Sequence, residues 1–240
     1  MVTRIFSERH PYVAVVAFAA VILQGTAGLA FAAVYGFDVA RHADLGALIE
    51  RGPGAAQGFR LALLVDMLAY LAVAPVVLHL HRRLRASAPG QTPLPWVVDV
   101  VGFSGLLFVI AGSIGATILA LAGSSLIEAA TAGGASETAA RVAFGAISRA
   151  VDEGLWGPLE WLAAGIWVGG LGWLLRNEGR GFALTGMAAG LGALVYAVRT
   201  GLTGRNPVET GDPIDLVALA ALGLFAIWEL WLAGRLWLGR

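Results

Sequence analysis

The chain has 240 residues, of which 58% are hydrophobic and 13% are charged, and its formal net charge is zero. A soluble domain carries about 25% charged residues and about 45–50% apolar residues. A soluble fold of this size could not bury so large an apolar excess. We therefore expect an integral membrane protein in contact with the lipid bilayer. Without net positive charge, the sequence gives no indication of nucleic-acid binding.

Two residue types are missing, and each absence excludes a kind of chemistry. The sequence has no cysteine, which excludes disulfides, thiolate metal sites and iron–sulfur clusters. All 16 basic residues are arginine. Without lysine the chain cannot form a Schiff base with retinal or pyridoxal phosphate. The bias toward alanine, glycine and arginine is typical of a GC-rich bacterial genome.

Six segments are long and apolar enough to span a membrane. A spanning helix needs about 20 mostly apolar residues. The first segment is too long for a signal peptide and ends without a small-residue cleavage site, so we expect it to be retained. The expected fold is one all-α domain over residues 1–240, a bundle of six transmembrane helices. The spans are 12–36, 58–80, 96–123, 157–175, 181–203 and 213–238.

The arginines predict the orientation of these spans, because cytoplasmic loops carry an excess of basic residues. Both termini and the loops 81–95 and 176–180 share one side. That side holds Arg4, Arg9, Arg82, Arg83, Arg85, Arg176, Arg180, Arg235 and Arg240. The other side holds Asp38, Asp44, Glu50, Glu128, Glu137, Asp152, Glu153, Glu209 and Asp212. We expect both termini to be cytoplasmic and the protein to lie in a bacterial inner membrane.

Two helices are also predicted in the outer loops. Polar residues recur at helical spacing between Glu137 and Asp152, with apolar residues between them. We expect an amphipathic helix over about 137–153, which lies on the outer membrane surface or covers the bundle. The pair Gly133-Gly134 would supply the hinge before it. A short helix is expected from Asp44 to Glu50.

Ionisable residues inside spans are functional candidates, because a charge in hydrocarbon is costly. Asp66 lies in the second span, with Arg60 nearer the outer surface and Tyr70 one turn further in. Tyr196 and Arg199 lie near the outer end of the fifth span. Either Asp66 pairs with Arg60 or Arg199 to fix helix packing, or these groups line a polar pocket open to the outside.

Glu160 follows Pro158 at the predicted start of the fourth span. Because proline favours the first helical turn, we expect Glu160 in that turn, near the outer interface and level with Asp66. In the inner half, Glu229 is expected to pair with Arg82, Arg83 or Arg235. Glu160 and Asp66 would be catalytic if the protein is an enzyme. The candidate ligand-binding residues are Arg60, Asp66, Tyr70, Trp156, Glu160, Tyr196 and Arg199.

Known catalytic motifs are mostly excluded. Gly102-Phe103-Ser104-Gly105 matches the GxSG of rhomboid-type proteases, but those enzymes need a later histidine, and all four histidines precede it. His79 and His81, two residues apart, cannot face one ion from a helix. We expect no metal site and no cofactor. The segment Trp156–Trp161 is similar to the Pro-x-Glu element of membrane-embedded carotenoid and terpenoid cyclases, although Trp161 stands where they have a second acid.

Small residues predict where helices pack closely, at Gly186-x-x-x-Gly190 and Gly112-x-x-x-Ala116. The segment from Gly172 to Gly190, together with the second span that contains Asp66, resembles a family of uncharacterised bacterial six-helix membrane proteins. That resemblance implies a fold and no function.

Three functional hypotheses remain open. The first is binding or transport of a small, partly polar solute through an outward-facing pocket, as in the six-helix substrate-capture subunits of vitamin importers, which the expected architecture resembles. The second is an acid-type membrane enzyme, a cyclase or isomerase that acts on an isoprenoid or lipid. The third is a structural or regulatory subunit, whose partner is another membrane subunit or a second copy of the chain.

Overall fold

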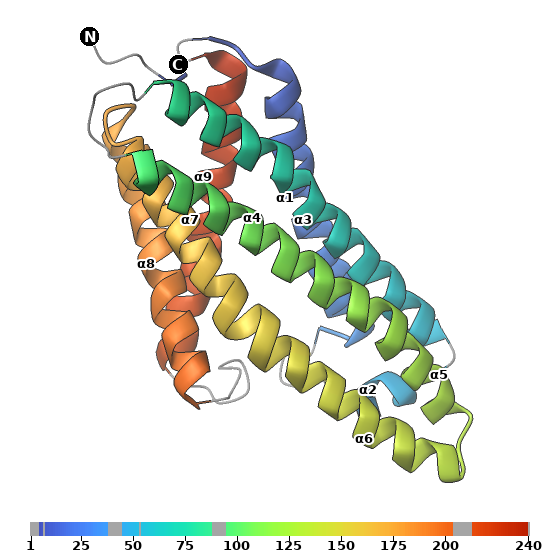
Figure 1. The fold of residues 1–240 in the computed structure, drawn as a ribbon. Helices are drawn as coiled ribbons and strands as arrows, with labels where there is room; N and C mark the ends of the chain where they lie inside the picture. The colour runs from blue at the N-terminus through green and yellow to red at the C-terminus, as the bar shows by residue number, and fades with distance from the viewer. Residues whose placement is uncertain are drawn as a thin grey trace.

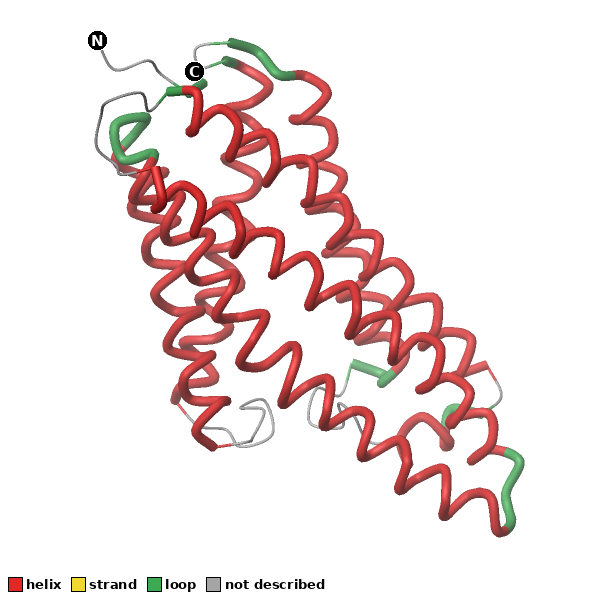
Figure 2. Tube along the Cα trace, in the orientation of Figure 1, coloured by secondary structure: helices red, strands yellow, loops and turns green. Residues whose placement is uncertain are grey.

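The computed structural model describes residues 5–6, 8–37, 45–52, 54–87, 95–203 and 213–239. Within these residues every regular element is a helix (Figures 1 and 2). The helices run side by side along most of their length, as in a bundle. The all-α fold expected from the sequence is therefore confirmed.

Among the described residues, five helical segments are long and apolar enough to cross a membrane. They are α1 (Pro11–Val34), α3 (Gly54–Ala86), the segment Pro95–Thr131, α8 (Arg180–Thr203) and α9 (Pro213–Leu238, apolar from Leu216). Pro95–Thr131 combines α4 (Pro95–Ile118), the π-helical η2 (Leu119–Gly123) and α5 (Ser124–Thr131). These segments support a multi-pass membrane protein.

The fourth expected span corresponds to the π-helical η3 (Ala150–Glu160) followed by α7 (Trp161–Leu174). α7 has only 14 residues and lies between α4 and α8. A crossing by this segment stays a prediction.

Helix ends meet at one end of the bundle, which we call the basic end (Figure 1). The start of α1 lies beside the end of α9, because the His10 amide donates a 2.8 Å hydrogen bond to the Leu236 carbonyl. Arg83 at the end of α3 forms a 3.2 Å ion pair with Glu8. The described arginines placed here by the helix order are Arg9, Arg82, Arg83, Arg85, Arg176, Arg180 and Arg235.

The helix order thus gathers the described arginines of the predicted cytoplasmic side at one end. Burial, together with the nearby charge of Arg83, lowers the pKa of His10 below its ordinary value of 6.5, against the opposite effect of Glu8. Arginine therefore carries the positive charge of this end at neutral pH. The remaining residues used for the orientation, Arg4, Asp38, Asp44, Glu209, Asp212 and Arg240, lie outside the described residues.

The predicted amphipathic helix exists, but it is not a separate element. α6 (Ala135–Arg149) continues without a break through η3 into α7, and packs against α5 (Figure 1). It extends the axis of α7 rather than crossing the bundle as a distinct surface helix. The expected hinge is confirmed, since Gly133 and Gly134 have φ of +77° and +73°, a region that favours glycine. The short helix is α2 (Leu45–Glu50).

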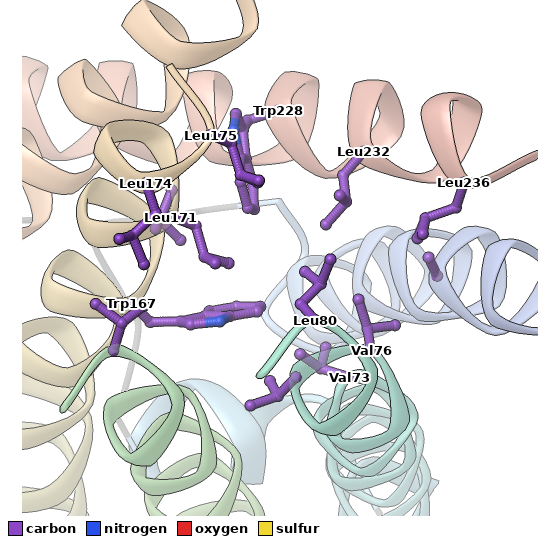
Figure 3. Close-up of a cluster of buried hydrophobic side chains, with 14 of the residues drawn as sticks. Val73, Val76, Leu80, Trp167, Leu171, Leu174, Leu175, Trp228, Leu232 and Leu236 are labelled. Atoms are coloured by element: carbon purple, nitrogen blue, oxygen red, sulfur yellow. The ribbon is translucent and has the colours of Figure 1, made fainter. Parts of the chain in front are cut away.

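Aromatic rings fill the core of the basic half. Trp167 and Trp228 are almost fully buried, and Phe182 stacks on Trp228 at a centroid distance of 5.3 Å. Figure 3 shows Trp167 reaching from α7 toward Val73 and Leu80 of α3. This packing holds α7 inside the bundle.

A second core lies at the opposite end of the molecule. There Phe59, Phe144, Leu48 and Ile127 pack α2, α3, α5 and α6 together. The central cavity described below lies between the two cores.

Glycines allow α7 and α8 to approach closely. A Cβ on Gly190 would lie 2.5 Å from both the Cα and the N of Gly169, so the two backbones are in direct contact. This confirms the close approach expected at Gly186-x-x-x-Gly190. Gly112, in the second predicted packing site, does not contact a helix backbone. The space beside it is filled by the side chain of Tyr70.

We expect Gly190→Ala to destabilise the bundle, because the added methyl group meets backbone atoms that cannot rotate away. Overpacking of this kind costs about 1–3 kcal/mol. The matched control is Gly223→Ala in α9, where a Cβ meets no atom within 4 Å. Thermal unfolding in detergent should show a lower midpoint for Gly190→Ala than for Gly223→Ala, and equal midpoints would contradict the packing described.

Candidate functional site

A cavity of about 220 Å³ lies in the middle of the bundle. Its polar lining comes from Gln24 of α1, Asp66 and Tyr70 of α3, and Glu160 at the end of η3. The rest of the wall is aromatic or aliphatic. It consists of Gly28, Phe108, Trp161, Ala164, Val168, Ala189, Ala193, Ala221, Leu222 and Phe225. The cavity therefore combines two carboxyl groups with an otherwise apolar wall.

Tyr70 and Glu160 connect α3 to η3 across this cavity. The Tyr70 hydroxyl donates a 2.7 Å hydrogen bond to Oε1 of Glu160. Oε2 of Glu160 is buried, and no described residue donates a hydrogen bond to it. Asp66 lies four residues before Tyr70 on the same face of α3. One side of the Glu160 carboxyl is thus satisfied by the protein and the other is available to a ligand.

No arginine or histidine is among the described residues that line the cavity. Tyr70 donates a hydrogen bond to Glu160, and Asp66 lines the same cavity. A buried carboxylate without a cation is costly. The cavity consequently favours a positively charged or proton-donating occupant over an anion.

Aromatic rings surround these carboxyl groups. Tyr70 and Phe108 have centroids 5.2 Å apart, and Phe108 and Phe225 have centroids 5.9 Å apart. Trp161 packs on Tyr196 at 4.6 Å, so Tyr196 supports the wall from outside. Aromatic faces attract cations, which adds to the preference set by the carboxyl groups.

A second cavity of about 180 Å³ shares Gly28 and Asp66 with the first. Trp156 forms part of its wall, and the indole N–H of Trp156 donates a 3.3 Å hydrogen bond to the Gly112 carbonyl. Asp66 therefore borders both cavities.

The central cavity is lined by two residues that are exposed on the surface of the bundle. Leu222 of α9 is 47% exposed, and Gly28 of α1 is also exposed. The central cavity thus reaches the outer surface of the bundle between α1 and α9.

The structure brings together three of the seven candidate ligand-binding residues, Asp66, Tyr70 and Glu160. Trp156 lies next to them and lines the second cavity. Tyr196 lies behind Trp161. The two arginines do not line the central cavity. Arg60 donates a 3.0 Å hydrogen bond to Ser124 and lies 3.8 Å from Glu128, so it does not pair with Asp66. Arg199 has interactions of its own.

The predicted helix start at Pro158 is wrong. Pro158 lies inside η3, an 11-residue π-helical stretch that continues α6. π-Helical stretches within α-helices are frequent at functional sites. Because no helix begins there, Glu160 is not in a first turn at the interface. It lies in the bundle interior, where its side chain is only 8% exposed.

The predicted arginine partner of Glu229 is also wrong. Arg83 pairs with Glu8, and Arg235 donates a 2.8 Å hydrogen bond to the Glu178 carbonyl. The Gln24 amide instead lies beside the Glu229 carboxyl. Glu229 is buried, and its Oε2 accepts no hydrogen bond from the described residues. Gln24 therefore connects the cavity to a third carboxyl group.

Sequence reasoning missed Gln24, Phe108 and Phe225 as wall residues, and it placed Trp161 near Glu160 without including it among the candidate ligand-binding residues. An amide inside a span was a usable signal for Gln24. The aromatic residues carried no signal, because apolar rings are ordinary in spanning helices. In the described part of the chain, no group of three or more acidic or histidine side chains is placed to hold a metal ion.

Comparison of the chain with protein-family models, curated proteins and solved structures finds no match in any of the three. The resemblance to uncharacterised six-helix membrane proteins therefore stays a prediction.

We expect Tyr70→Phe to destabilise the protein, because it leaves a buried carboxyl oxygen without its donor. Such a loss costs about 1–3 kcal/mol. The same substitution in a Glu160→Leu background should cost far less, since the acceptor is already absent. Unfolding free energies of the four proteins form a double-mutant cycle, and an equal cost in both backgrounds would show that the two side chains are not coupled.

Proposed function

We propose that the protein binds a small, partly apolar organic cation in the central cavity, within the membrane. The observation that carries this proposal is the composition of the cavity wall. Asp66 and Glu160 face a common space whose described lining holds no basic residue. A ligand ammonium group would supply the missing positive charge, and the hydroxyl of Tyr70 would keep Glu160 in position.

The size of the cavity limits the apolar part of the ligand. An engineered protein cavity of about 150 Å³ binds benzene. A cavity of about 220 Å³ therefore accommodates one aromatic ring with a short amine-bearing chain. The rings of Phe108, Trp161 and Phe225 would contact both the apolar part and the charge, and a cation over an aromatic face gains about 0.5–2 kcal/mol.

One observation supports the alternative hypothesis that the protein is an acid-type membrane enzyme. A buried carboxyl group hydrogen-bonded to a tyrosine and surrounded by rings suits protonation of an alkene, because the rings would stabilise the resulting carbocation. A long isoprenoid does not fit within a cavity of about 220 Å³, so only a small alkene is compatible with it. Glu160→Gln should then leave such a substrate bound and unconverted.

We further propose that the basic end faces the cytoplasm of a bacterial cell and that η3 and α7 form the sixth crossing. The arginines at the ends of α3, α8 and α9 support this orientation by the positive-inside rule. The cavity then opens in the outer half of the membrane and toward lipid between α1 and α9.

The orientation can be tested by cysteine labelling, because the chain has no cysteine of its own. Ala86→Cys places an exposed thiol at the basic end, and Ser136→Cys places one at the opposite end. A membrane-impermeant maleimide added to intact spheroplasts should label Ser136→Cys only. Detergent-permeabilised cells provide the control, in which both thiols should react, and labelling of Ala86→Cys in intact spheroplasts would reverse the topology.

Ligand binding can be tested with two probes of the same shape and different charge. We expect the protein in lipid nanodiscs to bind phenethylamine at least about tenfold more tightly than 2-phenylethanol, equivalent to about 1.4 kcal/mol. Asp66→Asn and Glu160→Gln should each weaken this preference, because each takes one of the two carboxyl groups from the wall.

The matched control is Glu128→Gln, which changes an acid that is 60% exposed and lies outside the cavity. Equilibrium dialysis against empty nanodiscs corrects for partitioning into lipid. Equal affinity for the two probes would contradict the proposed function.

A further inference from the structure

We propose that the cavity exchanges the organic cation for a proton, with Glu229 as the next proton acceptor on the route toward the basic end. This inference rests on the proposed function and adds proton-coupled transport to it. It starts from the electrical balance of the cavity. Asp66 and Glu160 cannot both stay ionised in an apolar space without a cation, and the described lining supplies none.

The groups around the cavity define what can take part in the exchange. Ionisable side chains come from α3 (Asp66 and Tyr70), from η3 (Glu160) and, behind Gln24 of α1, from α9 (Glu229). The cavity-lining residues from α4, α7 and α8 carry no ionisable group. The carboxyl groups can therefore take up protons in place of the ligand, and no basic side chain of the described lining competes with it.

The exchange step is a simple displacement. In the empty cavity a carboxyl group holds its proton in an O–H bond. When the organic cation enters, that O–H bond breaks, its electron pair stays on the carboxylate oxygen, and the proton leaves to water. The carboxylate then pairs with the cation, so the charge of the cavity is the same before and after.

The buried carboxyl groups form a series that leads away from the cavity. Oε2 of Glu160 and Oε2 of Glu229 are both buried, and neither accepts a hydrogen bond from the described residues. Gln24 lines the cavity, and its side chain lies beside Glu229. Glu229 follows the wall residue Phe225 by one helical turn of α9, about 6 Å nearer the basic end.

This placement gives Glu229 a role that helix packing does not explain. A carboxyl group buried without a cation is unfavourable as a purely structural element. A proton acceptor beyond the cavity allows the proton to reach the basic end while the ligand leaves by another path, between α1 and α9. Competition of the proton and the organic cation for the same carboxyl groups is what couples their exchange.

The test uses benzyltrimethylammonium, a permanent cation that has no proton to release. Added to the protein in weakly buffered nanodiscs with a pH-indicator dye, it should release about one proton for each cation bound. Its affinity should rise as the pH increases, by up to about tenfold per unit. Glu160→Gln and Asp66→Asn should each lower the proton yield, whereas the exposed Glu128→Gln should not.

A second measurement examines the route through Glu229. In proteoliposomes, a proton gradient should drive uptake of radiolabelled benzyltrimethylammonium, and Glu229→Gln should slow this uptake at least about tenfold, equivalent to about 1.4 kcal/mol. Glu229→Asp, which keeps the carboxyl group, should restore part of the rate.

The outcomes separate this inference from the proposed function. Cation binding without proton release would overturn proton exchange and leave the binding site intact. An unchanged uptake rate in Glu229→Gln would overturn the proposed route. Failure of both organic cations to bind would overturn the proposed function itself.

Discussion

The hydrogen bond from Tyr70 to Glu160 joins α3 to η3, and the wall of the cavity depends on it. The Tyr70 ring can lie there only because Gly112 of α4 leaves room for it, since a Cβ on Gly112 would overlap the ring. Two further glycines of α4 have the same effect, with Gly105 beside Trp167 and Gly115 beside Trp156. These glycines of α4 thus leave the space into which aromatic side chains of other helices pack. Because these rings pack against the glycines, they keep the cavity open between the helices.

Much of the fold could be predicted from composition and periodicity, because hydrophobic length and arginine position are strong local signals in membrane proteins. The arginines at the ends of α3, α8 and α9, the hinge at Gly133-Gly134 and the contact at Gly190 are examples. The predicted helix start at Pro158 was wrong. The usual preference of proline for a helix start is a local effect, and here a π-helical stretch accommodates it inside a continuous helix.

The site was only partly predictable, because its parts come from distant segments. Asp66, Tyr70 and Glu160 were identifiable as polar groups in apolar spans. Their assembly with Gln24 and Phe225 depends on helix packing, which no local pattern encodes. The wall from α8 consists of Ala189 and Ala193, whose small side chains carry no functional signal. The prediction for Glu229 failed because Arg83 and Arg235 are bound to Glu8 and Glu178, while the Gln24 amide lies beside the Glu229 carboxyl.

The distribution of arginine supports both the proposed topology and the proposed chemistry of the cavity. Several described arginines are held by acids outside the central cavity: Arg60 by Glu128, Arg83 by Glu8, Arg85 by Asp99 and Arg141 by Glu137. An arginine in the cavity wall would neutralise Asp66 or Glu160 permanently and leave no charge for a ligand. The described residues of the cavity wall include no arginine, so under the proposed function the ligand supplies the positive charge that pairs with Asp66 and Glu160.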